Sequence, residues 1–230
     1  MDRIKHNLEE IKGRIDAAAK AAGRNPADIR LVAVTKTVGL EGLRAAVAAG
    51  QNLFGENYVQ EAKAKIAALG PVLTWHFIGH LQSNKARLAV ELFDLIHSVD
   101  RLSLAVALEQ AAARLGKVQE ILLQVNLAGE ESKSGTAPEN AEALLRDLSR
   151  LPHLKVLGLM TMPPWFDEPE RVRPYFRELR QLRDRLRRLQ LVEGDLPELS
   201  MGMTGDFEVA VAEGATLVRI GTAIFGRRTR

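Results

Sequence analysis

The sequence predicts an α/β protein that forms a (β/α)8 barrel of the TIM type. The first observation is that eight short apolar runs of strand length alternate with helical patterns. The second is that several of these runs are apolar throughout, as expected of parallel strands that are covered on both faces. The third is that no G-x-G-x-x-G follows the first run, which disfavours an open dinucleotide-binding sheet.

A predicted helix opens the chain ahead of the first strand. Apolar residues recur there at spacings of three and four, which places them on one helical face: Ile4, Leu8, Ile11 and Ile15. We assign residues 1–24 to this extra N-terminal helix. We expect residues 1–230 to form a single barrel domain.

The eight predicted strands follow in order. They are LVAV (31–34), NLFGE (52–56), TWHFIGH (74–80), DLIHSV (94–99), EILLQVN (120–126), LKVLGLM (154–160), PELSMGM (197–203) and TLVRIG (216–221). Helical patterns lie between them, at residues 40–49, 57–69, 101–115, 138–150 and 170–190. The last pattern is the clearest, because an apolar stripe at helical spacing lies opposite a face rich in arginine.

Composition limits the location and the chemistry. The chain has no cysteine, which excludes disulfides, thiolate nucleophiles and cysteine-ligated metals and is typical of a reducing cytoplasm. Its N-terminus lacks the apolar segment of a signal peptide, and no run approaches the roughly 18 apolar residues of a membrane span. We therefore predict a cytoplasmic protein with no membrane contact.

The arginine-rich segment raises the question of a polyanionic partner. Residues 170–188 hold eight arginines and three acidic residues, a pattern that suits electrostatic binding of RNA. The same arginines occupy the predicted solvent face of an amphipathic helix, which is their commoner role. The formal net charge of +3 is also small, so we do not expect nucleic acid as a partner.

Polar residues gather where the predicted strands end. In barrels of this type the chemistry lies at the C-terminal ends of the strands. From the first strand to the sixth, these ends carry Lys36, Glu56 with Asn57, His80, Ser98, Asn126 and Thr161. Polar side chains therefore converge on one mouth of the barrel.

The two last loops have the features of a phosphate site. SMGMTGD supplies the hydroxyls of Ser200 and Thr204 beside glycines that let a backbone approach a ligand closely. IGTAIFG places Gly221 and Thr222 at the start of a helical turn, where free backbone N–H groups attract anions. Phosphate sites in this fold recur after strands seven and eight. An ordinary glycine-rich turn is the alternative interpretation.

Lys36 ends the first strand at the same mouth. A solvated lysine at a strand end is the simpler interpretation. In a partly desolvated pocket, however, the pKa of a lysine falls and its neutral amine forms Schiff bases with carbonyl compounds. An aldehyde that carries a phosphate would satisfy both ends of this site. Pyridoxal 5′-phosphate (PLP) is the cofactor of that description.

The motifs AVTKT, FGENYVQE, WHFIGHLQSNK, HSVD, LMTM and LSMGMTGDFEVAVAEGATLVRIGTAIFG together resemble the pyridoxal phosphate homeostasis proteins. The resemblance extends from about residue 5 to residue 228. It implies an alanine-racemase-like barrel without the C-terminal β-domain, which binds PLP and has no established catalytic turnover. Such a protein would buffer PLP or deliver it to apoenzymes that require it, and we expect it to be a monomer.

The resemblance also implies roles for individual residues. Lys36 would form the Schiff base, and Arg219 would face the pyridine nitrogen and keep it unprotonated by charge repulsion. The phosphate would be held by Ser200, Thr204, Gly221 and Thr222, and the ring pocket would be lined by Asn57, His80 and Met201. His76 and His80 would share a strand face, but no third ligand accompanies them, so we expect no metal site.

Two enzymatic alternatives share the lysine chemistry. An amino-acid racemase of this cofactor class takes a second acid–base tyrosine from a C-terminal β-domain, for which a chain that stops at Arg230 leaves no room. We therefore expect at most weak racemisation. A Schiff-base aldolase usually carries its lysine on strand six, which here ends in Met160 and Thr161.

Overall fold

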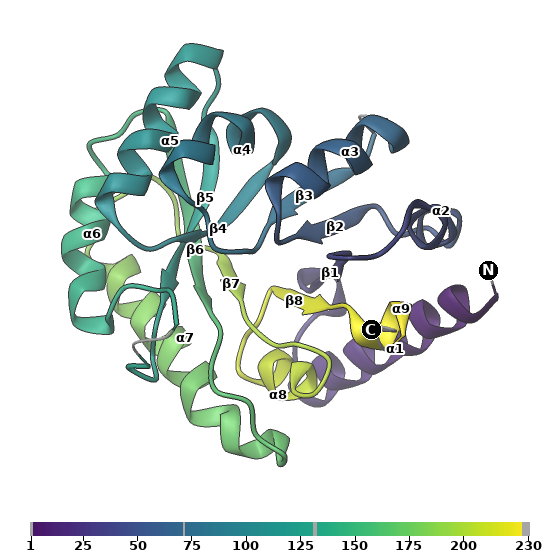
Figure 1. Cartoon of the computed structure of the whole chain (residues 1–230). Helices are drawn as coiled ribbons and strands as arrows, with labels where there is room; N and C mark the ends of the chain where they lie inside the picture. Colours follow the sequence, from purple (N-terminus) through teal and green to yellow (C-terminus); the bar gives the residue numbers. More distant parts are fainter. Residues whose placement is uncertain (1, 71, 131–132, 227–230) are drawn as a thin grey trace.

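The computed structural model describes residues 2–70, 72–130 and 133–226 (Figure 1). Eight parallel strands close into a barrel in the order of the sequence, because β1 pairs with both β2 and β8. They are β1 (Arg30–Val34), β2 (Leu53–Glu56), β3 (Thr74–Phe77), β4 (Leu95–Val99), β5 (Gln119–Val125), β6 (Leu154–Thr161), β7 (Glu198–Ser200) and β8 (Leu217–Ile220). This closure confirms the predicted barrel.

Helices surround the barrel, as Figure 1 shows. The α-helices are α1 (Asp2–Ala21), α2 (Leu40–Ala48), α3 (Val59–Leu69), α4 (Ala86–Leu92), α5 (Leu102–Leu115), α6 (Ala141–Leu148), α7 (Arg173–Arg188), α8 (Phe207–Ala212) and α9 (Thr222–Phe225). Short 3₁₀ turns precede β1, α4, α6 and α7: η1 (Pro26–Asp28), η2 (Ser83–Lys85), η3 (Pro138–Asn140) and η4 (Pro169–Val172). No helix in the described ranges is both long enough and apolar enough to cross a membrane.

The strands bury side chains on both faces. The larger apolar cluster lies between strands and helices and includes Leu31 and Ala33 of β1. Val32, between them, points to the opposite face, because side chains alternate along a strand. It belongs to a second cluster inside the barrel, made of Val32, Leu53, Leu95, Leu122, Met160 and Leu217. This double burial explains why the strand segments are apolar throughout.

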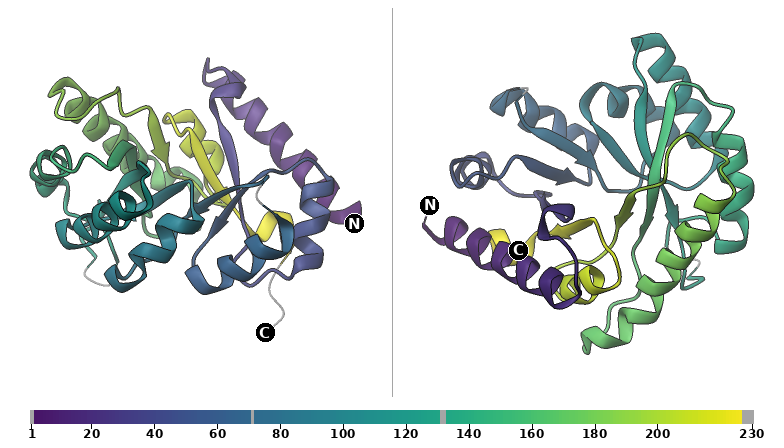
Figure 2. Two further views of the ribbon diagram at one scale, coloured as in Figure 1. Left: turned by 90° about the horizontal axis from the view of Figure 1, so that it is seen from above. Right: turned by 180° about the vertical axis from the view of Figure 1, so that it is seen from behind.

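The N-terminal helix packs against the helices at the other end of the chain. α1 packs against α8 and α9, which come from the other end of the chain (Figure 2). Asn7 Nδ2 donates to the carbonyl of Ile224 at 2.9 Å. Just after the helix, Arg24 Nη1 donates to the carbonyls of Val211 and Ala215 at 2.7 and 2.8 Å. The helices that follow β7 and β8 are therefore tied to the first 24 residues of the sequence.

Two strands, β3 and β7, end three residues before their predicted ends. β3 ends at Phe77 rather than at residue 80, because the chain turns where Gly79 lies against Asn57. A Cβ on Gly79 would be only 2.3 Å from the carbonyl oxygen of Asn57. β7 ends at Ser200, shortly before Gly202 adopts a φ of 91° that a strand does not allow. The expectation that His76 and His80 share a strand face is therefore wrong.

Candidate functional site

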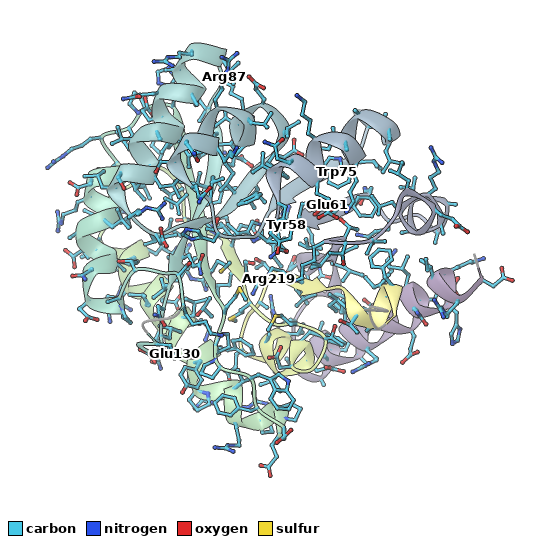
Figure 3. All side chains as sticks on the ribbon, in the orientation of Figure 1. Tyr58, Glu61, Trp75, Arg87, Glu130 and Arg219 are labelled. Atoms are coloured by element: carbon cyan, nitrogen blue, oxygen red, sulfur yellow. The ribbon has the colours of Figure 1, made fainter. Side chains whose placement is uncertain are left out.

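A cavity of about 710 Å³ opens at the C-terminal ends of the strands. One wall comes from the segment after β1 and another from the segment between β6 and α7, which contributes Met162, Trp165 and Phe166. Six residues predicted for the site line this cavity: Lys36, Asn57, Thr204, Arg219, Gly221 and Thr222. In Figure 3, Arg219 lies toward the centre of the barrel, whereas Arg87 lies at the periphery.

Lys36 lies in a tight turn directly after β1. The amide of Val38 donates to the carbonyl of Thr35 at 2.9 Å, which closes a four-residue turn with Lys36 at its second position. Thr37, at the third position, has a φ of 65°. A positive φ there is the geometry of a type II turn and normally requires glycine or asparagine. A β-branched residue in this conformation costs about 1–3 kcal/mol, so other contacts must hold the turn in place.

A buried ion-pair network supplies those contacts. Lys65 Nζ of α3 lies 2.6 Å from one carboxylate oxygen of Glu56 and 2.6 Å from one of Glu61, and it also donates to the carbonyl of Thr35 at 2.6 Å. The hydroxyl of Thr35 donates to Glu56 at 2.6 Å, and the amide of Thr37 donates to Glu61 at 2.6 Å. Both neighbours of Lys36 are thus bound to one network, and in Figure 3 Glu61 lies on the barrel side of α3.

Two opposing effects act on the pKa of Glu56 in this network. Its side chain is fully buried, and burial raises the pKa of the carboxyl group. Hydrogen bonds from Lys65 and Thr35 act in the opposite direction by stabilising the carboxylate. One carboxylate oxygen of Glu56 accepts from both Lys65 and Thr35, and the other is buried without a hydrogen-bond partner among the described residues.

Arg219 is the buried cation of the cavity. Its Nη1 donates to Ser200 Oγ at 2.5 Å and its Nη2 donates to the carbonyl of Thr161 at 2.9 Å. Burial lowers the pKa of Arg219 to about 10, and the nearby carboxylate of Asp206 opposes this shift. The guanidinium therefore stays charged at neutral pH, and two of its donors are fixed by the protein.

A chain of hydrogen bonds continues from Arg219 into the barrel. His97 Nδ1 lies 2.9 Å from Ser200 Oγ, and His97 Nε2 lies 3.0 Å from His76 Nδ1. Burial lowers the pKa of His76 to about 3 and that of His97 well below its usual value, and charge repulsion from Arg219 adds to the effect on His97. Both rings are neutral. Since an arginine only donates, Ser200 accepts from it and has its own hydrogen to give to His97.

The segments after β7 and β8 supply further hydrogen-bond donors to the cavity. Thr204 lies in the loop between β7 and α8, which is closed by a hydrogen bond of 2.6 Å from the amide of Met203 to Asp206. Burial raises the pKa of Asp206, while the Met203 amide and Arg219 oppose this rise. Gly221 precedes α9 and Thr222 begins it, so the first amides of this turn have no acceptor within the helix.

Asn57 contributes an orphaned acceptor. It follows β2 and lines the cavity, and its Oδ1 is buried without a hydrogen-bond partner among the described residues. Buried polar atoms are nearly always satisfied in folded proteins. An acceptor of this kind beside a cavity indicates a place for a ligand donor or a bound water.

Three of the predicted residues do not line the cavity. His80 follows the end of β3, is exposed, and lies with its Nδ1 2.9 Å from Ser134 Oγ. Met201 is fully buried in the outer apolar cluster. Ser200 is also fully buried, and its hydroxyl contacts Arg219 and His97. Among the described residues, no group of three or more potential ligands is placed to hold a metal ion.

Several residues around the site were missed by sequence reasoning. Glu61 and Lys65 are four apart in YVQEAKAK, which is the spacing of an ion pair on a helix, and this signal was available. His97 was given no role in the site, and the structure places it buried on β4 between Ser200 and His76. No sequence signal identifies Ser200 as its partner, because the two residues are 103 positions apart.

The arginines of α7 are largely engaged within the protein. Five of the eight arginines in residues 170–188 form ion pairs: Arg173, Arg177, Arg180, Arg183 and Arg187. Three of these converge on Glu213, which is buried beneath them after α8. Much of the positive charge of this helix therefore serves to neutralise acidic groups of the chain itself.

Comparisons with known sequences give a consistent picture. Residues 1–229 match the family model described as alanine racemase, N-terminal domain. A pyridoxal phosphate homeostasis protein of Aquifex aeolicus is 48% identical over 222 residues, which are 96% of this chain and 96% of that protein. A protein of the same name from Escherichia coli K12 is 44% identical over 233 residues, covering 99% of this chain and 98% of that protein.

Solved structures agree with the sequence relatives. PipY of Synechococcus elongatus, whose structure was determined with PLP bound, is 41% identical and superposes with a TM-score of 0.86, covering 97% of this chain and 100% of that one. An alanine racemase from Corynebacterium glutamicum is 20% identical, with a TM-score of 0.74, and the match covers 99% of this chain and 62% of that one. At that identity the likeness is one of fold.

Proposed function

This chain belongs to the pyridoxal phosphate homeostasis protein family, and on that premise we propose that it binds PLP at the mouth of its barrel and holds it as a Schiff base on Lys36. The observation that carries this proposal is that one cavity joins Lys36 to a buried arginine and a loop end rich in donors. PLP presents an aldehyde, a ring nitrogen and a phosphate, and each has a complementary group here. The bond forms when the amine of Lys36 adds to the aldehyde carbon and water leaves.

The residues of the cavity fit the remaining parts of this ligand. The hydroxyls of Thr204 and Thr222 and the backbone amides of Gly221 and Thr222 would hold the phosphate, since a helix start favours anions. Arg219 would face the ring nitrogen, and Asn57 would offer its unpartnered oxygen. Ser200 accepts a hydrogen bond from Arg219, so we assign it the role of holding that guanidinium in place rather than of contacting the ligand. The roles implied for His80 and Met201 rest on the family resemblance alone.

We propose storage and delivery rather than turnover as the role of this binding. A free aldehyde reacts with cellular amines, and a covalent but reversible bond to a lysine in a partly closed cavity limits such reactions. A permanently charged arginine beside the ring nitrogen disfavours its protonation, so the ring withdraws electrons less strongly than it would beside a carboxylate. The relatives are named for homeostasis. The recipients would be apoenzymes that require PLP, and the protein would act as a cytoplasmic monomer.

The test is to trap the ligand chemically. The purified protein is saturated with PLP, treated with borohydride and digested, and the labelled peptide is identified by mass spectrometry. We expect the label on Lys36, and we expect Lys36→Ala to lose both the yellow colour and the label while it keeps some noncovalent binding. Lys155→Ala, which removes an exposed lysine on β6, should behave as the wild type. A label on another side chain, or no label at saturation, would refute the proposal.

An amino-acid racemase is the alternative that shares these groups. Racemisation of a common amino acid at about 1–10³ per second, the range of ordinary metabolic enzymes, would favour it over a storage role.

A further inference from the structure

The turn that carries Lys36 is held in an unfavourable conformation by bonds to the residues on either side of Lys36. The amide of Thr37 donates to Glu61, the carbonyl of Thr35 accepts from Lys65, and the hydroxyl of Thr35 donates to Glu56. These bonds fix the residues on both sides of Lys36 to β2 and α3. We infer that Glu61 and Lys65 are positioning residues, which orient Lys36 for bond formation with an aldehyde ligand.

Backbone geometry makes this role necessary. Thr37 has a φ of 65°, which β-branched residues rarely adopt, so the turn has no intrinsic preference for its observed shape. Strained residues persist only where the surrounding structure determines their conformation, and they gather at functional sites. Here the conformation is determined by the carboxylates of Glu56 and Glu61 and by the ammonium group of Lys65. Without these contacts, we expect the turn to relax and the backbone that carries Lys36 to lose its fixed orientation.

Charge and burial explain why the network is rigid. Lys65 Nζ makes three contacts of 2.6 Å, and its side chain is only 7% exposed. A buried ammonium group with all three hydrogens bound cannot rotate away without leaving an unpaired charge in the interior. Glu61 is more accessible, with 27% of its side chain exposed, and it joins the ammonium group to the Thr37 amide. It is therefore the member that can be changed with the least damage to the fold.

This inference rests on the proposed Schiff base at Lys36, and the experiment separates the two. Binding of PLP is compared with binding of pyridoxamine 5′-phosphate, which has the same ring and phosphate but an amine in place of the aldehyde. For Glu61→Ala we expect the apparent affinity for PLP to fall about tenfold, equivalent to about 1.4 kcal/mol. The affinity for the amine ligand should stay unchanged, because only the bond to Lys36 is affected. Borohydride trapping should slow in parallel.

Two further variants sharpen the result. Glu61→Gln keeps an acceptor oxygen for the Thr37 amide, so it should restore most of the PLP affinity that Glu61→Ala loses. Glu142→Ala, which removes an exposed i,i+4 ion pair with Arg146 on α6, is the matched control and should bind both ligands as the wild type does. If Lys65→Met folds, it should show the same selective loss of PLP affinity as Glu61→Ala. If it does not fold, the result for Glu61→Ala decides the test.

The outcomes are distinct. Equal losses for the two ligands in Glu61→Ala would indicate general damage to the site and would overturn the positioning role. Unchanged PLP affinity in that variant would overturn it as well. If the wild-type protein itself forms no trapped bond at Lys36, the proposed function fails instead, whatever the variants do.

Discussion

Replacing Ser200 by alanine tests how the buried arginine of the cavity is supported. The hydroxyl of Ser200 accepts from Arg219 at 2.5 Å and contacts His97 Nδ1 at 2.9 Å, and all three side chains are buried. The alanine variant leaves a charged donor and an imidazole nitrogen without this partner. A lost bond to a charged group costs about 1.5–3 kcal/mol, and an unsatisfied neutral group costs about 1–3 kcal/mol. Because the two losses share one atom, we expect about 2–4 kcal/mol of unfolding free energy to be lost.

The assay is urea unfolding of the ligand-free protein. A contact between Ser200 and phosphate alone would leave this measurement unchanged, so a loss of stability without ligand identifies the support of Arg219 as the role of Ser200. Ser98→Ala is the matched control, because Ser98 lies buried on β4 and its Oγ has no partner among the described residues. We expect that control within about 0.5 kcal/mol of the wild type. Equal stabilities of the Ser200 and Ser98 variants would refute the reasoning.

The remaining predictions concern stability at two other places. Burial raises the pKa of Glu213, but hydrogen bonds from Arg173 and Arg177 and the charges of Arg177 and Arg180 together lower it overall. The carboxylate therefore stabilises the fold above its unfolded pKa of about 4.3, and this contribution is lost as the pH falls through the folded pKa. Glu213→Gln should therefore cost about 2 kcal/mol in urea unfolding at pH 7, with the difference from wild type shrinking below about pH 4, and a pH-independent difference would contradict this. Gly79→Ala would place its Cβ 2.3 Å from the carbonyl of Asn57, so we expect a loss of about 1–3 kcal/mol and weaker PLP binding. Gly13→Ala, where the Cβ would meet nothing within 4 Å, is its control, and equal thermal midpoints for the two variants would contradict the close approach.

The barrel was predictable because strands covered on both faces must be apolar along their whole length. Each strand segment shows this requirement in its own sequence. In β1, for example, Leu31 and Ala33 pack in one apolar cluster and Val32 packs in the other. The ends of the strands were less predictable, because tertiary contacts set them. β3 stops where Gly79 meets Asn57, and nothing in the sequence TWHFIGH indicates that encounter.

The candidate site was predictable where it depends on position along a strand. Lys36 and Asn57 directly follow the strands that deliver them, and Gly221 and Thr222 start the last helical turn. The supporting contacts were not predictable in the same way. Lys65 has the spacing of an exposed helix residue, and only the fold shows that it turns inward to Glu56. Ser200 was assigned to a phosphate by its neighbours in sequence, whereas its neighbours in space are Arg219 and His97.

The way the chain closes on itself has a consequence for its biosynthesis. β1 pairs with β8, and α1 packs against α8 and α9. The first 34 residues therefore cannot complete their native contacts until roughly the last 25 residues have been synthesised. At roughly 5–20 residues per second, a ribosome takes about 10–40 s to add the intervening chain. During that interval the nascent protein has an unpaired strand edge and an uncovered helix face. The cavity at the mouth of the barrel can therefore form only after translation is nearly complete, because Lys36 is made early and Arg219, Gly221 and Thr222 are made last.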